Sequence, residues 1–226
     1  MSDFPFDTIG FDLDGTLVDT APDLRHAVNH ALATIARPPL SEEAVRRMVG
    51  GGTRAMLTRA LDASGGAVDA ETFQHINSDL IAFYEGHTAE ESAPYPGCLA
   101  ALDALESRGC RLAVVTNKLE YLARKLLDEL GMSHRFDCII GGDTLGPGRA
   151  KPERDMLDEA LRRCGGSRFA MVGDSSFDVR AARAAEAPVV VLTAGYHDAP
   201  PEALGADALI DGFDELVAAL ERLGPG

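Results

Sequence analysis

The feature that most constrains the fold of this chain is the regular alternation of short apolar runs with longer amphipathic segments. Nearly continuous apolar runs separated by helix-length segments are typical of a parallel sheet covered by helices on both faces. We expect strands at Phe6–Phe11, Arg111–Val115, Cys138–Ile140, Phe169–Val172 and Val189–Leu192, with a weaker one at Ala208–Ile210. Helices are expected at Gly97–Ser107, Glu120–Glu129, Arg154–Cys164, Asp178–Ala185 and Phe213–Leu223. The sequence therefore predicts an α/β protein with a doubly wound parallel sheet.

One region breaks this alternation. From about Ala21 to Glu90 there is no convincing strand, and apolar residues recur at the spacing of helices. We expect four helices here, inserted after the first strand as a small helical subdomain. The segment Ala89–Pro96, which is acidic and carries two prolines, is expected to lead the chain back as a linker. The predicted division is a helical cap at residues 20–92 and a core formed by residues 1–19 and 93–226.

Composition excludes several classes of protein. The 226 residues include 36 acidic and 21 basic side chains, a formal net charge of −15, which disfavours partners such as nucleic acid or an anionic membrane. The four cysteines are spread out without a C-x-x-C pair, so we expect reduced, buried thiols. The chain shows neither a secretory signal nor an apolar run of the roughly 20 residues that span a bilayer. We therefore expect a cytoplasmic protein.

An acidic motif follows the first predicted strand directly. Asp12 and Asp14 lie in the run D-L-D-G-T, at the sheet edge where open α/β sheets bind ligands. Two carboxylates separated by one residue of extended chain point the same way, and they repel each other unless a cation lies between them. The alternative is a simple acidic turn in which Gly15 supplies a positive φ.

Three further segments follow later strands. Thr116 and Asn117 lie where a strand gives way to a helix, whose free N–H groups can hold a phosphate. Lys151 follows a glycine-rich loop, although taken alone it is more simply a solvated charge at a helix start. Asp174 and Asp178 follow the next strand; Asp174 or its neighbour Ser175 can equally serve as a helix N-cap.

Taken in order, D-x-D-G-T, the strand-end Thr, Lys-Pro and G-D-S-x-x-D resemble the haloacid dehalogenase superfamily over essentially the whole chain. That resemblance implies a Rossmann-like core, and the helical insert is similar to the family's C1 cap. The V-V-T-N-K and T-A-G-Y segments resemble the phosphoglycolate phosphatase branch. Arg154 and Glu186 depart from that branch's usual Pro and Gly, at positions that are not catalytic.

The resemblance implies a role for each motif residue. Asp12 would attack phosphorus and form an aspartyl-phosphate, and Asp14 would act as general acid and then as general base. Thr116, Asn117 and Lys151 would bind the oxygens of the transferring phosphoryl group.

The resemblance also implies Mg²⁺ as the cofactor. Its ligands would be Asp12, the backbone carbonyl of Asp14, and Asp174, with Asp178 behind them and outside direct coordination.

Substrate choice is expected to depend on the cap. The run Gly50–Gly52 is either a helix-to-helix turn, with Thr53 as the next N-cap, or, as the resemblance implies, the substrate-specificity loop of the cap. In the second interpretation Gly51 and Gly52 let the backbone approach a ligand, and Arg54 binds a substrate carboxylate.

The predicted activity is hydrolysis of a small anionic phosphate ester such as 2-phosphoglycolate. Within enzymes, a sugar phosphate, a nucleotide or pyrophosphate is the alternative substrate. Outside enzymes, the alternative is a non-catalytic phosphate-binding or regulatory module. The expected partner is a small phosphorylated metabolite, with neither nucleic acid nor membrane, and either a monomer or a dimer is compatible with the sequence.

Overall fold

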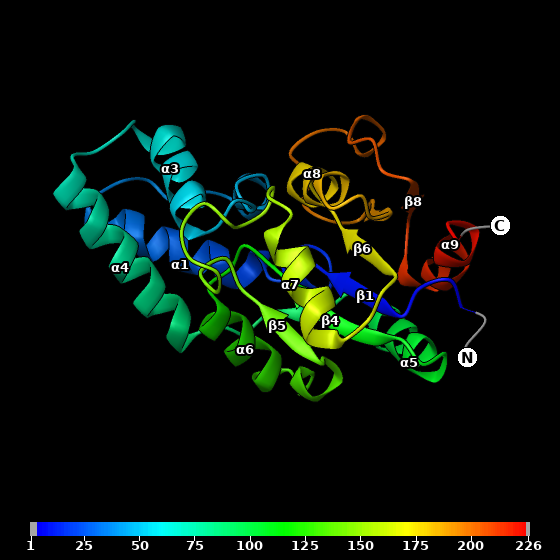
Figure 1. Cartoon of the computed structure of the whole chain (residues 1–226). Helices are drawn as coiled ribbons and strands as arrows, with labels where there is room; N and C mark the ends of the chain where they lie inside the picture. The colour runs from blue at the N-terminus through cyan, green and yellow to red at the C-terminus, as the bar shows by residue number, and fades with distance from the viewer. Residues whose placement is uncertain (1–3, 225–226) are drawn as a thin grey trace.

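A six-stranded parallel sheet forms the centre of the protein in this computed structural model, which describes residues 4–224 (Figure 1). The strands lie in the order β5-β4-β1-β6-β7-β8 and every neighbouring pair is parallel. Their bounds are β1 Thr8–Phe11, β4 Arg111–Val115, β5 Cys138–Ile140, β6 Phe169–Gly173, β7 Val189–Leu192 and β8 Ala208–Ile210. The predicted doubly wound sheet is confirmed.

Helices cover both faces of this sheet. One face carries α5 (Cys98–Ser107), α6 (Glu120–Glu129) and α9 (Leu216–Arg222), and the other carries α7 (Asp155–Cys164) and α8 (Ser176–Ala184). Alternate residues of each strand supply the two apolar layers, as the two-residue period of a strand requires. Short 3₁₀ turns occupy Ser133–Arg135, Pro201–Ala203 and Phe213–Glu215, the last replacing the first turn of the helix expected from Phe213.

The four cysteines lie in these apolar layers, as expected. Cys98 and Cys110 belong to the layer beneath α5, and Cys138 and Cys164 to the layer beneath α7. None of the helices among residues 4–224 is both long and apolar enough to cross a membrane.

Strand β1 is the point where the sheet changes direction. After the cap the chain adds β4 and β5 on one side of β1, and then returns to add β6, β7 and β8 on the other. Such a switch point opens a crevice at the carboxyl ends of the strands, where α/β sheets bind ligands. We therefore expect ligand-binding residues directly after β1, β4 and β6.

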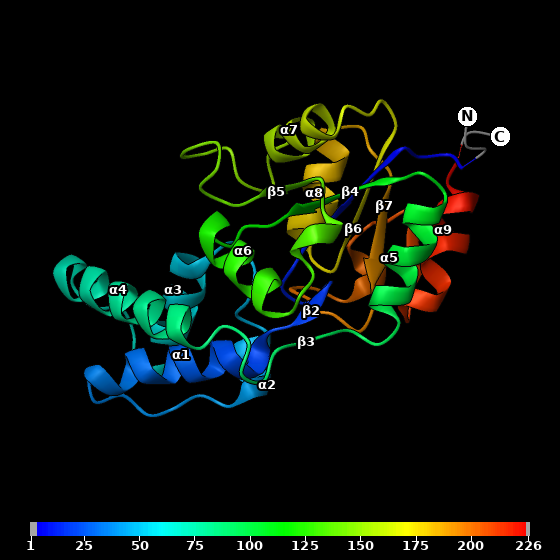
Figure 2. The same ribbon diagram turned by 90° about the horizontal axis from the view of Figure 1, so that it is seen from below.

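Four helices inserted between the first strand of the sheet and α5 form the cap, as expected. They are α1 (Ala21–Thr34), α2 (Glu42–Arg46), α3 (Thr53–Ser64) and α4 (Ala70–Gly86). Side chains from all four build an apolar core of their own, including Leu32, Val45, Leu57 and Ile76. The cap lies at the end of the sheet opposite α9, as both views show (Figures 1 and 2).

The two connections between cap and core are joined to each other. Strand β2 (Val18–Asp19) pairs antiparallel with β3 (Ala93–Pro94), so the second connection is partly a strand and not only the linker that the sequence suggested. Strands of two residues are too short to show a period of two, which explains why the sequence did not reveal them. The buried Asp23 of α1 accepts hydrogen bonds from the backbone N–H groups of Glu91 and Ser92 and ties the connections together.

Candidate active site

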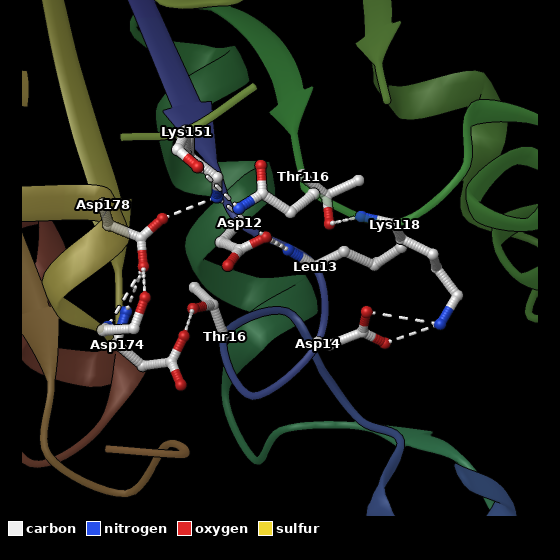
Figure 3. A network of polar contacts seen from close by, with 11 residues as sticks. Asp12, Leu13, Asp14, Thr16, Thr116, Lys118, Lys151, Asp174 and Asp178 are labelled. Atoms are coloured by element: carbon white, nitrogen blue, oxygen red, sulfur yellow. Dashed lines mark hydrogen bonds and ion pairs between the residues drawn. The ribbon is translucent and has the colours of Figure 1, made fainter. Parts of the chain in front are cut away.

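Three strands deliver the predicted site residues to one edge of the sheet. Phe11, the last residue of β1, is in register with Val114 of β4 and with Val172 of β6. Asp12, Thr116 and Asp174 follow these strands within one or two residues, so they converge from positions far apart in the chain (Figure 3).

Three carboxylates meet at this edge. One oxygen from each of Asp12, Asp174 and Asp178 lies within 4.8 Å of the others. Burial is the largest cause that raises the pKa of Asp12, to about 7, and the other carboxylates add to it while Lys151 opposes it. Burial, followed by Asp178 and Asp12, likewise raises the pKa of Asp174 well above its ordinary value. A cluster of buried oxygen donors that repel one another is the donor set that a hard divalent cation such as Mg²⁺ stabilises.

Lys151 joins this cluster as its one cation among the described residues. Its Nζ atom lies 2.6 Å from Asp178 Oδ1 and 3.1 Å from Asp12 Oδ1, and its side chain is 1% exposed. Burial opposes the charged ammonium, but the two carboxylates outweigh it and raise the pKa of Lys151 above the ordinary value. Lys151 is therefore a permanent positive charge beside Asp12.

Hydrogen bonds hold the carboxylates of α8 and of the loop before it. Asp178 Oδ2 accepts from the N–H of Asp174 at 3.2 Å, and from the N–H and hydroxyl of Ser175 at 3.0 and 2.6 Å. Ser175, and not Asp174, is the N-cap of α8. Because Asp178 Oδ1 contacts Lys151 and Asp178 Oδ2 accepts three hydrogen bonds, this carboxylate orients its neighbours.

Asp174 is held by two residues that the sequence analysis did not single out. Its Oδ1 accepts the hydroxyl of Thr16 at 2.7 Å, and its Oδ2 accepts the backbone N–H of Tyr196 at 2.6 Å. Thr16 stands in the D-L-D-G-T run and Tyr196 in the T-A-G-Y segment, so both lay within recognised motifs. A Cβ atom on Gly15 would lie 2.5 Å from Asp174 Oδ2, which explains the glycine between these contacts.

The Asp14 carboxylate points away from the other three (Figure 3). Its Oδ1 lies 2.9 Å from Lys118 Nζ and 2.7 Å from the hydroxyl of Thr20. Lys118 is 7% exposed, and its ammonium lies 4.4 Å from the ring centroid of Tyr84 in α4. Burial lowers the pKa of Lys118, but Asp14 and Tyr84 outweigh this and raise it above its ordinary value. Lys118 ends the V-V-T-N-K run but was not among the site residues predicted from the sequence.

Thr116 and Asn117, which follow β4, contact the backbone of Lys118 and of Lys151, respectively. Thr116 is 1% exposed, and its hydroxyl oxygen accepts the backbone N–H of Lys118 at 3.2 Å. The Asn117 amide donates to the backbone carbonyl of Lys151 at 3.0 Å, which joins the second and third motifs. The Asn117 Oδ1 atom is buried and has no hydrogen-bond partner within the described chain.

A cavity lies between the cap and this edge of the sheet. It encloses about 550 Å³ of empty space, including its opening to solvent. The core contributes Asp12, Asp14, Thr116, Asn117, Lys118, Asp174, Ser175, Phe177 and Tyr196, and the cap contributes Leu24, Val49, Gly50, Gly51, Gly52, Thr53 and Met56. The cavity thus brings Asp12, Asp14 and Thr116 together with the cap loop, whereas the buried Lys151 lies behind Asp12 and does not line the cavity.

The glycine loop packs directly on the core. A Cβ atom on Gly51 would lie 3.1 Å from the Phe177 ring, and one on Gly52 would lie 3.1 Å from the Asn117 carbonyl oxygen. Both glycines have positive φ, so a larger residue would be strained as well as crowded. Gly52, and not Thr53, is the N-cap of α3, which corrects the expected cap by one residue.

The structure does not bring Arg54 to the cavity. Arg54 is exposed on α3, and its guanidinium carbon lies 4.7 Å from the ring centroid of Phe73 in α4. It is absent from the residues that line the cavity. The expected contact with substrate is therefore not present in this arrangement, because packing between cap helices directs the side chain elsewhere.

The site and fold together define a class of protein. The profile of the haloacid dehalogenase-like hydrolases matches residues 6–186. The chain therefore belongs to this family of hydrolases, and its relatives place it among the phosphatases of that family.

The known proteins that this chain resembles belong to one branch of the family. A phosphoglycolate phosphatase of Caulobacter vibrioides is 46% identical over 208 residues, covering 91% of this chain and 87% of that protein. A phosphoglycolate phosphatase of Agrobacterium fabrum is 40% identical, over 93% of this chain and 90% of that protein. The crystal structure of a predicted phosphoglycolate phosphatase from Haemophilus somnus superimposes with a TM-score of 0.89 at 31% identity, covering 96% and 98% of the two chains. The resemblance to this branch is confirmed.

Proposed function

We propose that the protein is a Mg²⁺-dependent phosphomonoester hydrolase whose substrate is 2-phosphoglycolate. Two observations support this: the similarity to phosphoglycolate phosphatases, and the position of Asp12, which lines the cavity and lies beside the buried Lys151. We further propose that residues 20–92 act as the cap, and residues 1–19 with 93–226 as the catalytic unit.

Asp12 is the nucleophile in this proposal. A carboxylate oxygen of Asp12 bonds to phosphorus while the bond from phosphorus to the ester oxygen breaks, which gives an aspartyl-phosphate. The hydrogen bond from the Leu13 N–H to Asp12 Oδ1, 2.7 Å long, and the nearby Lys151 ammonium orient the carboxylate and favour its ionised form against the effect of burial.

Asp14 is the general acid and then the general base in this proposal. It donates a proton to the departing alkoxide and later takes one from the water that attacks the aspartyl-phosphate, which releases inorganic phosphate and restores both carboxyl groups. Asp14 lines the cavity beneath the cap, where the leaving group of a bound ester would lie.

The buried carboxylates are suited to bind Mg²⁺. Asp12, the backbone carbonyl of Asp14, and Asp174 would hold it, and Asp178 would orient Asp174 through the backbone. Bound there, the ion would neutralise negative charge on the phosphoryl group.

Lys151, Thr116 and Asn117 would bind the phosphoryl oxygens. Lys151 supplies the positive charge, Thr116 supplies a hydroxyl and Asn117 fixes the backbone around Lys151. Donors held in place before the reaction stabilise charge that develops in the transition state.

Lys118 is the residue that favours an anionic leaving group. Of the described residues that line the cavity, it alone carries a positive charge. It lies beside Asp14, where the group next to the ester oxygen would be found. A carboxylate one carbon from that oxygen, as in 2-phosphoglycolate, would reach this cation, and a charge-assisted pair there is worth about 1.5 to 3 kcal/mol.

The test is a panel of phosphate esters with Mg²⁺. We expect kcat/KM for 2-phosphoglycolate to exceed the values for sugar phosphates, nucleotides and pyrophosphate by at least about tenfold. This factor corresponds to one charge-assisted contact between the substrate carboxylate and Lys118. A higher value for one of the others would replace the substrate but keep the reaction. Absence of turnover on every ester, 4-nitrophenyl phosphate included, would contradict the reaction itself and indicate a phosphate-binding module.

A further inference from the structure

Tyr196 links the core of the molecule to the first helix of the cap. It follows β7 in the T-A-G-Y segment and is 4% exposed. Its hydroxyl oxygen accepts the backbone N–H groups of Thr20 at 2.7 Å and of Ala21 at 2.8 Å, and the hydroxyl donates to Asp19. A tyrosine hydroxyl has one donor and two acceptor sites, so this hydroxyl is fully used.

These contacts replace the usual cap of α1. The first N–H groups of a helix have no partner within it, and the N-cap side chain normally accepts one of them. Thr20 is the N-cap of α1 but makes no such bond, because its hydroxyl donates to Asp14 instead. Tyr196, 176 residues away, supplies the acceptor that Thr20 does not.

Thr20 is thereby free to hold Asp14. The bond from its hydroxyl to Asp14 Oδ1 is 2.7 Å long, and Lys118 Nζ lies 2.9 Å from the same atom. The backbone N–H of Thr20 is fixed by Tyr196, so the position of the Asp14 carboxylate depends on the phenolic oxygen through one intervening residue.

The ring and backbone of Tyr196 are anchored independently of its hydroxyl. The backbone N–H donates to Asp174, and a Cβ atom on Gly15 would lie 2.7 Å from the ring. The guanidinium of Arg46 in α2 lies 5.2 Å from the ring centroid and pairs with Asp19 at 2.6 Å. Loss of the hydroxyl alone would therefore leave the ring in place.

We propose that Tyr196 is a positioning residue for Asp14: its hydroxyl fixes Thr20 at the start of the cap, and Thr20 holds the Asp14 carboxylate at the leaving-group side of the cavity. This inference rests on the proposed function, because it takes Asp14 to be the acid that protonates the leaving group. A group that positions an acid matters most for esters whose leaving group needs a proton.

The test compares two leaving groups in the Tyr196→Phe variant. An alkoxide, as from 2-phosphoglycolate, needs the acid, whereas 4-nitrophenolate leaves without it. We expect kcat/KM for 2-phosphoglycolate to fall about 10- to 100-fold further than that for 4-nitrophenyl phosphate, part of the roughly 10²- to 10⁴-fold effect of a general acid. Tyr121→Phe is the matched control, because Tyr121 is exposed on α6 and does not line the cavity.

Thr20 supplies a second, independent variant. Thr20→Val keeps the backbone N–H that Tyr196 accepts but removes the hydroxyl, and is expected to show the same preferential loss on 2-phosphoglycolate. Thr20→Ser keeps a hydroxyl and is expected to restore most of the activity.

The outcomes separate this inference from the proposed function. Equal losses on both esters in the Tyr196→Phe and Thr20→Val variants would overturn the positioning role while leaving the hydrolase intact. No loss in either variant would overturn it as well. A wild-type protein that hydrolyses neither ester would overturn the proposed function first, and this inference with it.

Discussion

The Nζ atom of Lys118 lies 2.9 Å from Oδ1 of Asp14, so the one cation that lines the cavity among residues 4–224 is paired with a carboxylate of the same site. Both side chains are largely buried, at 5% and 13% exposure. Because this pair is enclosed, an anion that binds Lys118 would share the cation with Asp14 and lie next to that carboxyl group.

This relationship yields a prediction about substrate choice. Lys118→Met should lower kcat/KM for 2-phosphoglycolate about 10- to 150-fold relative to its effect on ethyl phosphate, the value of one charge-assisted pair. Ethyl phosphate has the same length and needs the same acid but lacks the carboxylate, so the ratio isolates recognition from any effect on Asp14. Steady-state kinetics on both esters provide the measurement.

Arg54→Ala is the matched control for that variant. Its guanidinium stacks on Phe73 outside the cavity, so its loss should change the ratio of the two esters less than about twofold. A larger change for Arg54→Ala than for Lys118→Met would return the carboxylate contact to Arg54 and contradict the assignment to Lys118.

A second prediction concerns the nucleophile. Asp12→Asn is nearly isosteric, but an amide cannot form the aspartyl-phosphate, so turnover should vanish on every ester while the fold is kept. Activity assays and circular dichroism on the purified variant test this. If a tenth of the wild-type activity survives, Asp12 is not the nucleophile.

Much of the fold and of the motif placement could be predicted from the sequence. Apart from the edge strand β8, the strands of the sheet are short, almost entirely buried apolar runs, so they stand out from the amphipathic helices around them. Asp12 and Asp174 follow such strands directly, and parallel strands bring their carboxyl ends to one edge. Local pattern and topology therefore sufficed to bring these two residues together.

The contacts that distant packing decides could not be predicted. Tyr196 meets Thr20 across 176 positions of sequence, and Lys118 meets Asp14 across 104. Arg54 lies at the start of a cap helix as expected, but its side chain packs on Phe73 of the neighbouring helix. Side-chain direction of this kind depends on how helices pack, which no local spacing records.

A third prediction concerns the metal. Chelation should abolish activity, Mg²⁺ should restore it and Ca²⁺ should not, because Ca²⁺ accepts longer and less regular coordination. Asp174→Ala should raise the Mg²⁺ concentration needed for half-maximal activity at least about tenfold, the lower end of losses for altered metal-site residues. Titration of activity with Mg²⁺ gives the measurement. Full activity in excess chelator would contradict the site.

The control for the metal prediction is Asp198→Ala. Asp198 is exposed and accepts the backbone N–H of Ser176 at the start of α8, outside the carboxylate cluster. Its loss should leave the Mg²⁺ requirement unchanged, and an effect equal to that of Asp174→Ala would show that both act through the stability of α8.

The last prediction is a pH dependence of stability that originates at Asp12. Without a metal the pKa of this carboxyl is about 7 in the folded protein, against the ordinary value of 3.8. A raised pKa means that the folded state binds the proton more tightly, so this stabilisation is complete below about pH 4 and is lost as pH rises through 7. Asp12→Asn cannot titrate. In chelator, the Tm of the wild type should therefore fall relative to that of the variant between pH 5 and pH 8.

The size of this shift follows from the pKa difference. About three pKa units set an upper bound of about 4 kcal/mol, and half of that corresponds to about 4 to 8 °C in a chain of this length. Asp174 is present in both proteins, but the charge of Asp12 helps to raise its pKa only in the wild type, so its titration shifts the comparison in the same direction. Added Mg²⁺ should raise the Tm of the wild type at pH 8 and narrow the gap, since the ion replaces the proton among the carboxylates. A Tm difference that is the same at pH 5 and pH 8 would show that Asp12 is already ionised throughout, with Lys151 alone sufficient to hold its charge.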